Sequence, residues 1–212
     1  ELSDVPCRVL GHRKKVDAHL RDRAEQALGM PGLAYDITPA RDPIGMAPSP
    51  ALSLLAKARP TLAGRKIGVL VSDGFEMALL EQLKGATEAE GAALHVIGPT
   101  IGRVKSSGKE MVTPDHAIAA APSVLFDTVV VAVSESDIEA LKRKAATLNF
   151  LRDAFNHLKF IGFTVASMPL LDAAGIAVDD AVIKIDSRAD AGAFVEAAKA
   201  GRFWPRAEVI KT

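Results

Sequence analysis

Ile67-Gly68-Val69-Leu70-Val71, followed by Ser72-Asp73-Gly74, is the stretch of the chain that decides the fold. Its continuous apolar run is bounded by a polar, glycine-containing turn, which is typical of a short strand buried on both faces. Beyond the turn, apolar residues recur at helical spacing at Met77, Leu80, Leu83 and Ala86. The stretch therefore predicts one strand, a tight turn and one helix.

Similar units recur along the rest of the chain. Further strands are expected at residues 93–97, 128–133, 160–165 and 181–185, and further helical segments at residues 138–141, 170–174 and 191–200. Residues 102–109 predict a turn-rich hairpin. Buried strands that alternate with helices indicate an α/β fold with a doubly wound, mostly parallel sheet.

The N-terminal part has a different pattern. Apolar residues at helical spacing predict an amphipathic helix from Val16 to Leu28, and prolines and glycines then interrupt any periodicity between Pro31 and Pro50. We therefore expect a helical arm over residues 1–30, a proline-rich linker over residues 31–63 and one domain over residues 64–212.

Composition and charge exclude several classes of protein. The 212 residues are 49% hydrophobic and 25% charged, and 26 basic side chains balance 26 acidic ones. No overall basic field attracts nucleic acid or an anionic membrane, and no apolar run reaches the ~20 residues that span a bilayer. We expect a cytoplasmic protein with neither partner, and the first residue, Glu1, suggests a fragment or a processed product.

The turn after the first strand is the first candidate site, because ligands of doubly wound sheets bind at the carboxyl ends of the strands. Gly74 stands without a Gly-x-Gly-x-x-Gly or Gly-Lys-Ser/Thr pattern, so a phosphate-binding loop is not favoured. Asp73 is expected to cap the following helix, and Glu76 is expected as an acid in its first turn.

The turn after residues 160–164 is the second candidate site, because an α/β enzyme could place a nucleophile there. Val165 and Ala166 occupy it, and neither side chain can attack a carbonyl or accept a proton. Ser167 lacks a Gly-x-Ser-x-Gly context and is expected to be a turn or capping serine.

Histidine and cysteine offer no metal-binding pattern. The histidines are scattered, without a His-x-x-x-His pair or an acidic cluster at ligand spacing, so we expect no metal site. The single Cys7 excludes an internal disulfide and is interpreted as structural. His95 alternates within a predicted strand and is also interpreted as structural. The two short basic runs, at residues 13–15 and 142–144, are interpreted as solvated helix faces.

Several separated motifs resemble one protein family. They are Gly64 to Gly74, Ala121-Pro122-Ser123-Val124-Leu125-Phe126-Asp127, Phe155-Asn156-His157-Leu158-Lys159 and Gly201-Arg202-Phe203-Trp204-Pro205-Arg206. In this order they resemble the C-terminal domain of large-subunit haem catalases, and Glu1-Leu2-Ser3, Gly29-Met30-Pro31 and Ser49-Pro50-Ala51-Leu52-Ser53 resemble the segment that precedes it. The resemblance covers nearly the whole chain.

The resemblance implies a flavodoxin-like domain without a catalytic centre of its own. The parent polypeptide would dismutate hydrogen peroxide as a homotetramer, with its haem in the missing N-terminal part. The family's haem ligands include a tyrosine in an Arg-x-Phe-x-Tyr pattern, and the only tyrosine, Tyr35, stands outside such a pattern. We therefore expect no cofactor in this chain, and the haem-binding part of the same polypeptide as its partner.

The domain is also similar, more distantly, to the class I glutamine amidotransferase-like superfamily of intracellular proteases and deglycases. That similarity implies a Cys-His pair at Val165 and Ala166 and an assisting acid at Glu76, of which only the acid is present. A chaperone-like role of the separated domain stays open. Two alternatives also remain: a stand-alone hydrolase or deglycase that uses Ser167 or Cys7, and a small-ligand sensor without catalysis.

Overall fold

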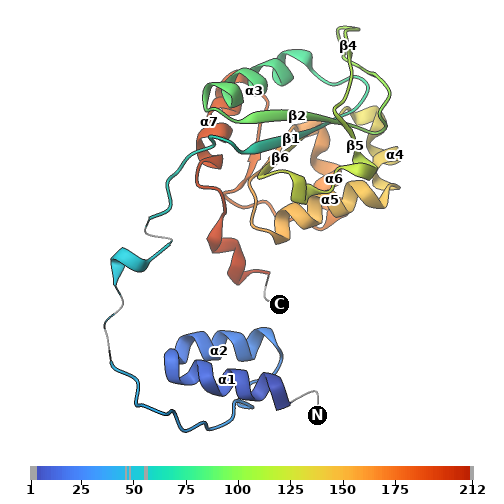
Figure 1. Ribbon diagram of the computed structural model, residues 1–212. Coiled ribbons are helices and arrows are strands. Elements are labelled where there is room, and N and C mark those ends of the chain that lie inside the picture. Colours follow the sequence, from blue (N-terminus) through green and yellow to red (C-terminus); the bar gives the residue numbers. More distant parts are fainter. Residues whose placement is uncertain (1–3, 46, 48, 55–56, 211–212) are drawn as a thin grey trace. The chain divides into compact units, whose positions relative to one another are not determined.

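The computed structural model describes residues 4–45, 47, 49–54 and 57–210, so that Glu1-Leu2-Ser3 and Pro48 lie outside the described residues. The chain divides into two compact units, Glu1–Ala58 and Arg59–Thr212 (Figure 1). Short 3₁₀ turns occur in both units, at η1 (Pro50–Leu52), η2 (Ile118–Ala120), η3 (Ser123–Leu125), η4 (Glu135–Asp137), η5 (Val165–Ser167) and η6 (Trp204–Glu208).

Helices α1 (Asp4–Val16) and α2 (Ala18–Ala27) belong to the first unit. The expected helix corresponds to α2, but it begins after Asp17, whose extended backbone interrupts the helical path. The Asp17 carboxylate then accepts a hydrogen bond from Leu20 N at 2.9 Å and caps α2. Helix α1 was not predicted, although Cys7 and Leu10 form its buried side.

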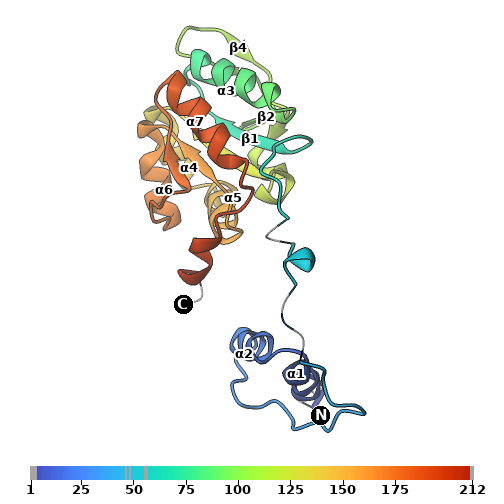
Figure 2. The same ribbon diagram turned by 90° about the vertical axis from the view of Figure 1, so that its left-hand side faces the viewer.

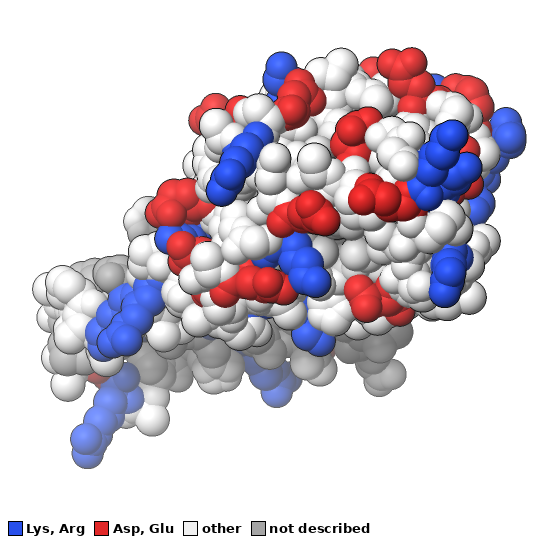
Figure 3. All heavy atoms as spheres, turned by 90° about the horizontal axis from the view of Figure 1, so that it is seen from above, with Lys and Arg blue, Asp and Glu red and all other residues white. Residues whose placement is uncertain are grey.

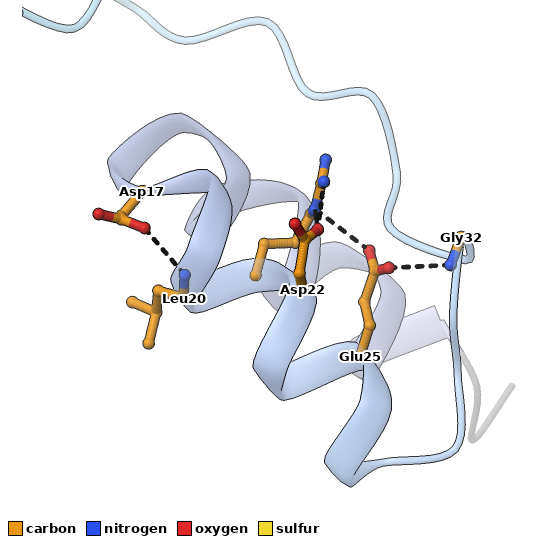
Figure 4. A network of polar contacts seen from close by, with 6 residues as sticks. Asp17, Leu20, Asp22, Glu25 and Gly32 are labelled. Atoms are coloured by element: carbon orange, nitrogen blue, oxygen red, sulfur yellow. Dashed lines mark hydrogen bonds and ion pairs between the residues drawn. The ribbon is translucent and has the colours of Figure 1, made fainter.

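A buried carboxylate holds the turn that follows α2 (Figure 4). Glu25 is only 7% exposed, and it accepts a hydrogen bond from Gly32 N at 2.8 Å while Arg21 Nε lies 3.6 Å away. The chain then packs against α1 so closely that a Cβ on Gly11 would lie 2.4 Å from Tyr35 O. Gly11 is therefore required by a close backbone approach.

The second unit is built on a six-stranded sheet of order β5-β2-β1-β6-β7-β8, in which the pairings are parallel. Its strands are β1 (Lys66–Val71), β2 (Ala93–Gly98), β5 (His116–Ala117), β6 (Thr128–Ala132), β7 (Ile161–Phe163) and β8 (Val182–Lys184). A separate antiparallel hairpin joins β3 (Val104–Lys105) to β4 (Met111–Val112). The predicted fold class and hairpin are confirmed.

Helices cover both faces of this sheet (Figure 2). One core cluster lies between the sheet and α4 (Ile138–Lys142), α5 (Ala145–Asn156) and α6 (Met168–Ala174). The other lies between the sheet and α3 (Met77–Ala89) and α7 (Arg188–Ala198). Strands β1 and β6 contribute to both clusters, which explains why their sequences are continuously apolar.

Charged side chains of both signs are interspersed over the face drawn in Figure 3. This mixed distribution agrees with the balanced composition, and no field of one sign covers that face. No helix within the described part of the chain is both long and apolar enough to cross a membrane.

Candidate functional site

The carboxyl ends of β1, β6 and β7 lie together at one end of the sheet, which is called the carboxyl edge below. A ligand site of this fold class would lie there. Glu76 stands at this edge, directly before α3. It occupies the N-cap position of α3 rather than the predicted first turn, and its side chain is exposed and makes no capping hydrogen bond.

Asp73 has a role that the sequence did not predict. Its carboxylate accepts a hydrogen bond from Lys105 N at 2.8 Å, and Gly74 N donates to Lys105 O at 2.7 Å. The expected helix cap is therefore wrong, because Asp73 fastens the β3–β4 hairpin to the end of β1. Gly74 has a φ of 87° in this turn, and an added Cβ would lie 3.1 Å from the Cβ of Ser134.

The turn after β7 contains Val165, Ala166 and Ser167, as predicted from the sequence. Val165 is 58% exposed, and its backbone N–H donates to Asp186 Oδ1 at 3.2 Å. Ser167 is completely buried; its hydroxyl donates to Val131 O at 3.0 Å and accepts from Val133 N at 3.2 Å. Ser167 caps no helix through its side chain and instead joins the turn to β6.

The hydroxyl groups of this edge form hydrogen bonds that connect the ends of neighbouring strands. Ser72 Oγ accepts a hydrogen bond from Ser134 N at 3.0 Å, the Ser134 hydroxyl donates to Asp73 O, and Thr164 Oγ1 lies 2.8 Å from Ser167 Oγ. Among the described residues, none of the hydrogen bonds of these four hydroxyls reaches a carboxylate or an imidazole. A serine nucleophile needs an adjacent base, and these hydrogen bonds supply none to the four hydroxyl groups.

A polar cleft of about 240 Å³ lies beside this edge. Its walls carry charges of both signs and include Asp73, Pro99, Thr100, Gly102, Arg103, Val104, Asp137, Ala140, Leu141 and Lys144. Lys144 Nζ donates to Pro99 O at 3.1 Å, and Asp73 is held by Lys105 N, so two of the four charged groups are already engaged within the fold.

The other candidate groups belong to other elements. His95 stacks on His116 with ring centroids 5.3 Å apart, and both rings pack near Phe126. Cys7 is buried in α1 of the first unit. Within the part of the chain that the structure describes, no group of three or more histidine, cysteine, aspartate or glutamate side chains could hold a metal ion.

Tyr35 does not fit the role of a haem ligand. Tyr35 belongs to the first unit, is 44% exposed, and donates its backbone N–H to Cys7 O at 3.0 Å. The hydrogen bond between its hydroxyl and the Asp4 carboxylate raises the pKa of Tyr35. An exposed phenol that is hydrogen-bonded to a carboxylate is not placed to ligate iron in a closed pocket.

The opposite end of the sheet, where the parallel strands begin, is called the amino edge below. It contains a buried lysine that was not predicted from the sequence. Lys159 is 2% exposed, and its ammonium donates to Phe126 O at 2.7 Å and to Ser123 O. Burial, followed by the nearby charge of Arg202, lowers the pKa of Lys159 to about 8. The preceding Leu158 has a φ of 60°, which ends α5 and turns the chain into β7.

Arg206 is the second buried cation at the amino edge. It is 1% exposed and forms a two-point pair with Asp179, with Nε–Oδ2 at 2.6 Å and Nη2–Oδ1 at 2.8 Å. Its Nη1 also donates to Lys159 O at 2.7 Å, and its guanidinium lies 4.2 Å from the ring centroid of Phe155. Arg206 thereby joins the C-terminal segment to α5 and to the start of β8.

The four motifs that resemble catalases are joined into one continuous set of contacts at this edge. A Cβ on Gly68 would lie only 2.8 Å from the ring of Phe126, and Phe126 O accepts a hydrogen bond from Lys159. Arg206 is bonded to Lys159 O in turn. The motif residues at this edge hold the fold together, and they lie opposite the edge where an enzyme of this fold class would have its active site.

The parallel sheet covered by helices on both faces defines a flavodoxin-like α/β domain. A solved structure, the crystal structure of Drosophila melanogaster DJ-1beta, shares this fold, of the class I glutamine amidotransferase-like type, with a TM-score of 0.56 and 17% identity over 69% of this chain and 95% of that one. At this identity the similarity shows the fold alone.

A model of the C-terminal domain found in long catalases matches residues 63–208. Catalase C of Rhizobium meliloti (strain 1021) is 35% identical over 209 residues, and catalase HPII of Mycobacterium avium is 30% identical over 178 residues. The chain belongs to the family of C-terminal domains found in long catalases. The matches cover 96% and 83% of this chain but only 29% and 24% of those two relatives, so the chain spans less than a third of their length.

Proposed function

We propose that this chain is a non-catalytic, stabilising domain of a large-subunit catalase. The proposal rests on the carboxyl edge, where Ser167 is bonded to Val131 O, and where Val165 stands at the position that the superfamily resemblance assigns to the nucleophile. An acid at Glu76 without a nucleophile supports no thiol chemistry. Ser167 is bonded within the fold and Cys7 is buried in α1, so neither residue favours the alternative of a stand-alone hydrolase.

The parent polypeptide would dismutate hydrogen peroxide, and its haem would be held by the part that precedes this chain. Two observations support this assignment: the relatives named catalase are more than three times as long as the matched segment, and Tyr35 does not fit the role of a haem ligand. The same reasoning makes the haem-binding part the main partner, within a cytoplasmic homotetramer.

A chaperone-like activity of the separated domain is part of this proposal. It is supported by large apolar side chains that are exposed in the second unit, such as Val124 at 74% and Trp204 at 56%. If the separated chain neither binds an apolar dye nor delays the aggregation of a heat-denatured test protein, this part of the proposal is wrong.

The proposed function is tested by comparing three proteins: the full-length polypeptide that carries this chain, a version that ends at Ala58, and the isolated chain. We expect the first two to decompose peroxide at initial rates within about twofold of each other, and the shortened version to lose activity at a lower temperature. The isolated chain should neither decompose peroxide nor give a haem absorption band when it is titrated with haemin. Equal thermal inactivation of the first two proteins, or peroxide decomposition by the isolated chain, would contradict the proposal.

A further inference from the structure

The polar cleft of about 240 Å³ beside the carboxyl edge lies where the strand order of the sheet reverses. From β1 the chain proceeds to β2 on one side, and it later enters β6 on the other side of β1. The cleft is lined by the segments that follow these three strands, with Asp73 after β1, Thr100 after β2 and Asp137 after β6. In open α/β sheets, such a reversal point is where small ligands bind.

Two of the four charged side chains of the cleft hold its walls together. The Asp73 carboxylate accepts a hydrogen bond from Lys105 N at 2.8 Å, which fastens the β3–β4 hairpin to the end of β1. Lys144 Nζ donates to Pro99 O at 3.1 Å, which connects the segment after α4 to the end of β2. These contacts exist without a ligand, so little conformational entropy would be lost when one binds.

The other two charged side chains, those of Arg103 and Asp137, have no such structural role. Among the hydrogen bonds and ion pairs of the described residues, none involves either of these side chains. Asp137 even occupies the N-cap position of α4 without a side-chain capping hydrogen bond, although an aspartate at this position commonly makes one. One guanidinium and one carboxylate that line the cleft are therefore left available to a ligand.

The charges and the size of the cleft determine the kind of ligand. Its two carboxylates and two cations balance, so an anion or a cation alone would be attracted by one pair and repelled by the other. A ligand with one charge of each sign can place its carboxylate in two parallel hydrogen bonds from Arg103 and its ammonium at Asp137. The cleft is also smaller than the ~300–1,000 Å³ of pockets for drug-sized ligands, which favours a smaller molecule.

We propose that this cleft binds a free amino acid, with Arg103 holding the carboxylate and Asp137 holding the ammonium group. The site needs no catalytic group, and it goes beyond the stabilising role proposed above. It is also separate from Glu76, Val165 and Ala166, because none of these three residues belongs to the lining of the cleft. Two charge-assisted contacts in a solvent-accessible cleft correspond to a dissociation constant on the order of 1 mM.

The test is a two-dimensional NMR titration of the isotope-labelled chain with each of the free L-amino acids, up to about tenfold the expected dissociation constant. We expect at least one of them to shift the backbone amide signals of Thr100, Gly102 and Val104 in a saturable way. The analogues of that amino acid that lack the amino group or the carboxylate should each bind at least about tenfold more weakly. The absence of saturable shifts at the cleft with every amino acid, or equally tight binding of either analogue, would overturn the inference.

Variants of the cleft give a second measurement. Arg103→Met and Asp137→Asn each remove one charge, and we expect each to weaken binding at least about tenfold. Ala140→Leu fills the cleft with all four charges retained and should have the same effect; Ala140 is exposed on α4 and leucine favours helices, so the fold should be kept. The matched controls are Glu135→Gln and Arg143→Met, which replace exposed charged residues that flank the cleft in sequence without lining it.

The controls should bind the amino acid within about twofold of the unchanged chain, because exposed charges outside the cleft contribute little. Unchanged binding in the cleft variants, or an equal loss in the controls, would contradict the assignment of the site. Circular dichroism of each variant without ligand verifies that it is folded. The titrations with the two analogues use the unchanged chain, so they decide the question even if a variant does not fold.

Discussion

Arg206 and Asp179 form a two-point ion pair, with N–O distances of 2.6 and 2.8 Å, at the amino edge of the sheet. Residue 179 precedes β8 and residue 206 lies in the last turn of the chain, so the pair ties the C-terminal segment to the sheet. The guanidinium is buried while part of the carboxylate remains exposed, with side-chain exposures of 0% and 25%. Loss of either partner would leave the other charge in a site built for a pair.

We expect Arg206→Met to destabilise the second unit by about 3–5 kcal/mol, the usual cost of removing one partner of a buried ion pair. Urea unfolding followed by circular dichroism measures the change. Arg206→Lys should recover only part of the loss, because an ammonium cannot make the two parallel hydrogen bonds. The matched control is Arg188→Met, because Arg188 is an exposed arginine of α7. This substitution should change stability by less than about 0.5 kcal/mol. A loss equal to that of the control would contradict the structural role of Arg206.

The same pair predicts a dependence of stability on acid pH. Burial alone would raise the pKa of Asp179, but the hydrogen bonds from Arg206 and from the backbone N–H groups of Ala181 and Val182 outweigh it and lower the pKa. A carboxylate whose pKa is lowered by folding contributes stability that is fully present above its pKa in the unfolded chain, about 3.9. This stability is lost as the pH falls through the pKa of the carboxylate in the folded chain. The stability difference between the wild type and Asp179→Asn should therefore be constant above about pH 5 and shrink in stronger acid. A difference that stays constant down to pH 2 would show that this carboxylate does not titrate as the geometry requires.

Local patterns predicted the sheet but not the contacts between its ends. The apolar run at residues 67–71 is enough to predict β1, because its neighbours bury it on both faces. Helix α5 was missed although Thr147, Phe150, Leu151 and Ala154 recur at helical spacing, so its signal is present in the sequence. Asp73 was misassigned because its partner, Lys105, lies 32 residues away.

The amino edge could have been detected only in part. Lys159 is a charged residue between Leu158 and Phe160 at the start of an apolar run, and this is the signal of a buried lysine. Its acceptors, Ser123 O and Phe126 O, are 36 and 33 residues away and come from backbone carbonyls, which carry no sequence signature. The inert residues Val165 and Ala166, in contrast, could be located from the strand pattern and the superfamily resemblance.

Two glycines should respond in opposite ways to the same substitution. Gly68→Ala would place a Cβ 2.8 Å from the ring of Phe126 and 3.0 Å from Ile97 Cδ1, and we expect this overpacking to cost about 1–3 kcal/mol. Gly85 lies inside α3 with open space at its Cβ position, so that Gly85→Ala should stabilise the unit by up to about 1 kcal/mol. Thermal unfolding of both variants measures the two effects. If Gly68→Ala stabilised the unit as Gly85→Ala does, the tight contact at Gly68 would have been relieved by movement of Phe126.

Ser167→Ala separates a structural serine from a catalytic one. The substitution leaves Val133 N without its acceptor, and an unpaired buried donor costs about 1–3 kcal/mol. We expect this loss in urea unfolding, with peroxide decomposition by the full-length polypeptide unchanged. Ser136→Ala is the matched control, since Ser136 is exposed and bonds only Ser134 Oγ at 2.9 Å among the hydrogen bonds described. A fall in any hydrolase activity of the isolated Ser167→Ala chain, with its stability unchanged, would contradict the structural role.

Lys159 predicts that the domain becomes more stable as the pH rises into the alkaline range. Burial lowers its pKa to about 8 in the folded chain, whereas an unfolded lysine titrates near 10.4. Between these values the unfolded chain binds more protons than the folded chain, so the free energy of unfolding rises with pH, by at most ~1.4 kcal/mol per pH unit. The neutral amine keeps two N–H donors, which match its two carbonyl acceptors, Ser123 O and Phe126 O. Deprotonation therefore removes the buried charge without breaking either hydrogen bond.

The measurement is the free energy of unfolding of the wild type and of Lys159→Met between pH 7 and pH 10. Wild-type stability relative to the variant should grow from about pH 8 upward, because the variant lacks the titrating group. Lys199 is the matched control, because its hydrogen bonds to Glu196 and Glu90 raise its pKa. The stability that Lys199 contributes is therefore constant up to the pKa of lysine in the unfolded chain, and it is lost only above that pH. The difference between the wild type and Lys199→Met should therefore not grow in this range. A wild-type advantage over Lys159→Met that stays flat or falls as the pH rises would mean that the two carbonyl hydrogen bonds hold Lys159 in its charged form, and that its burial does not control the titration.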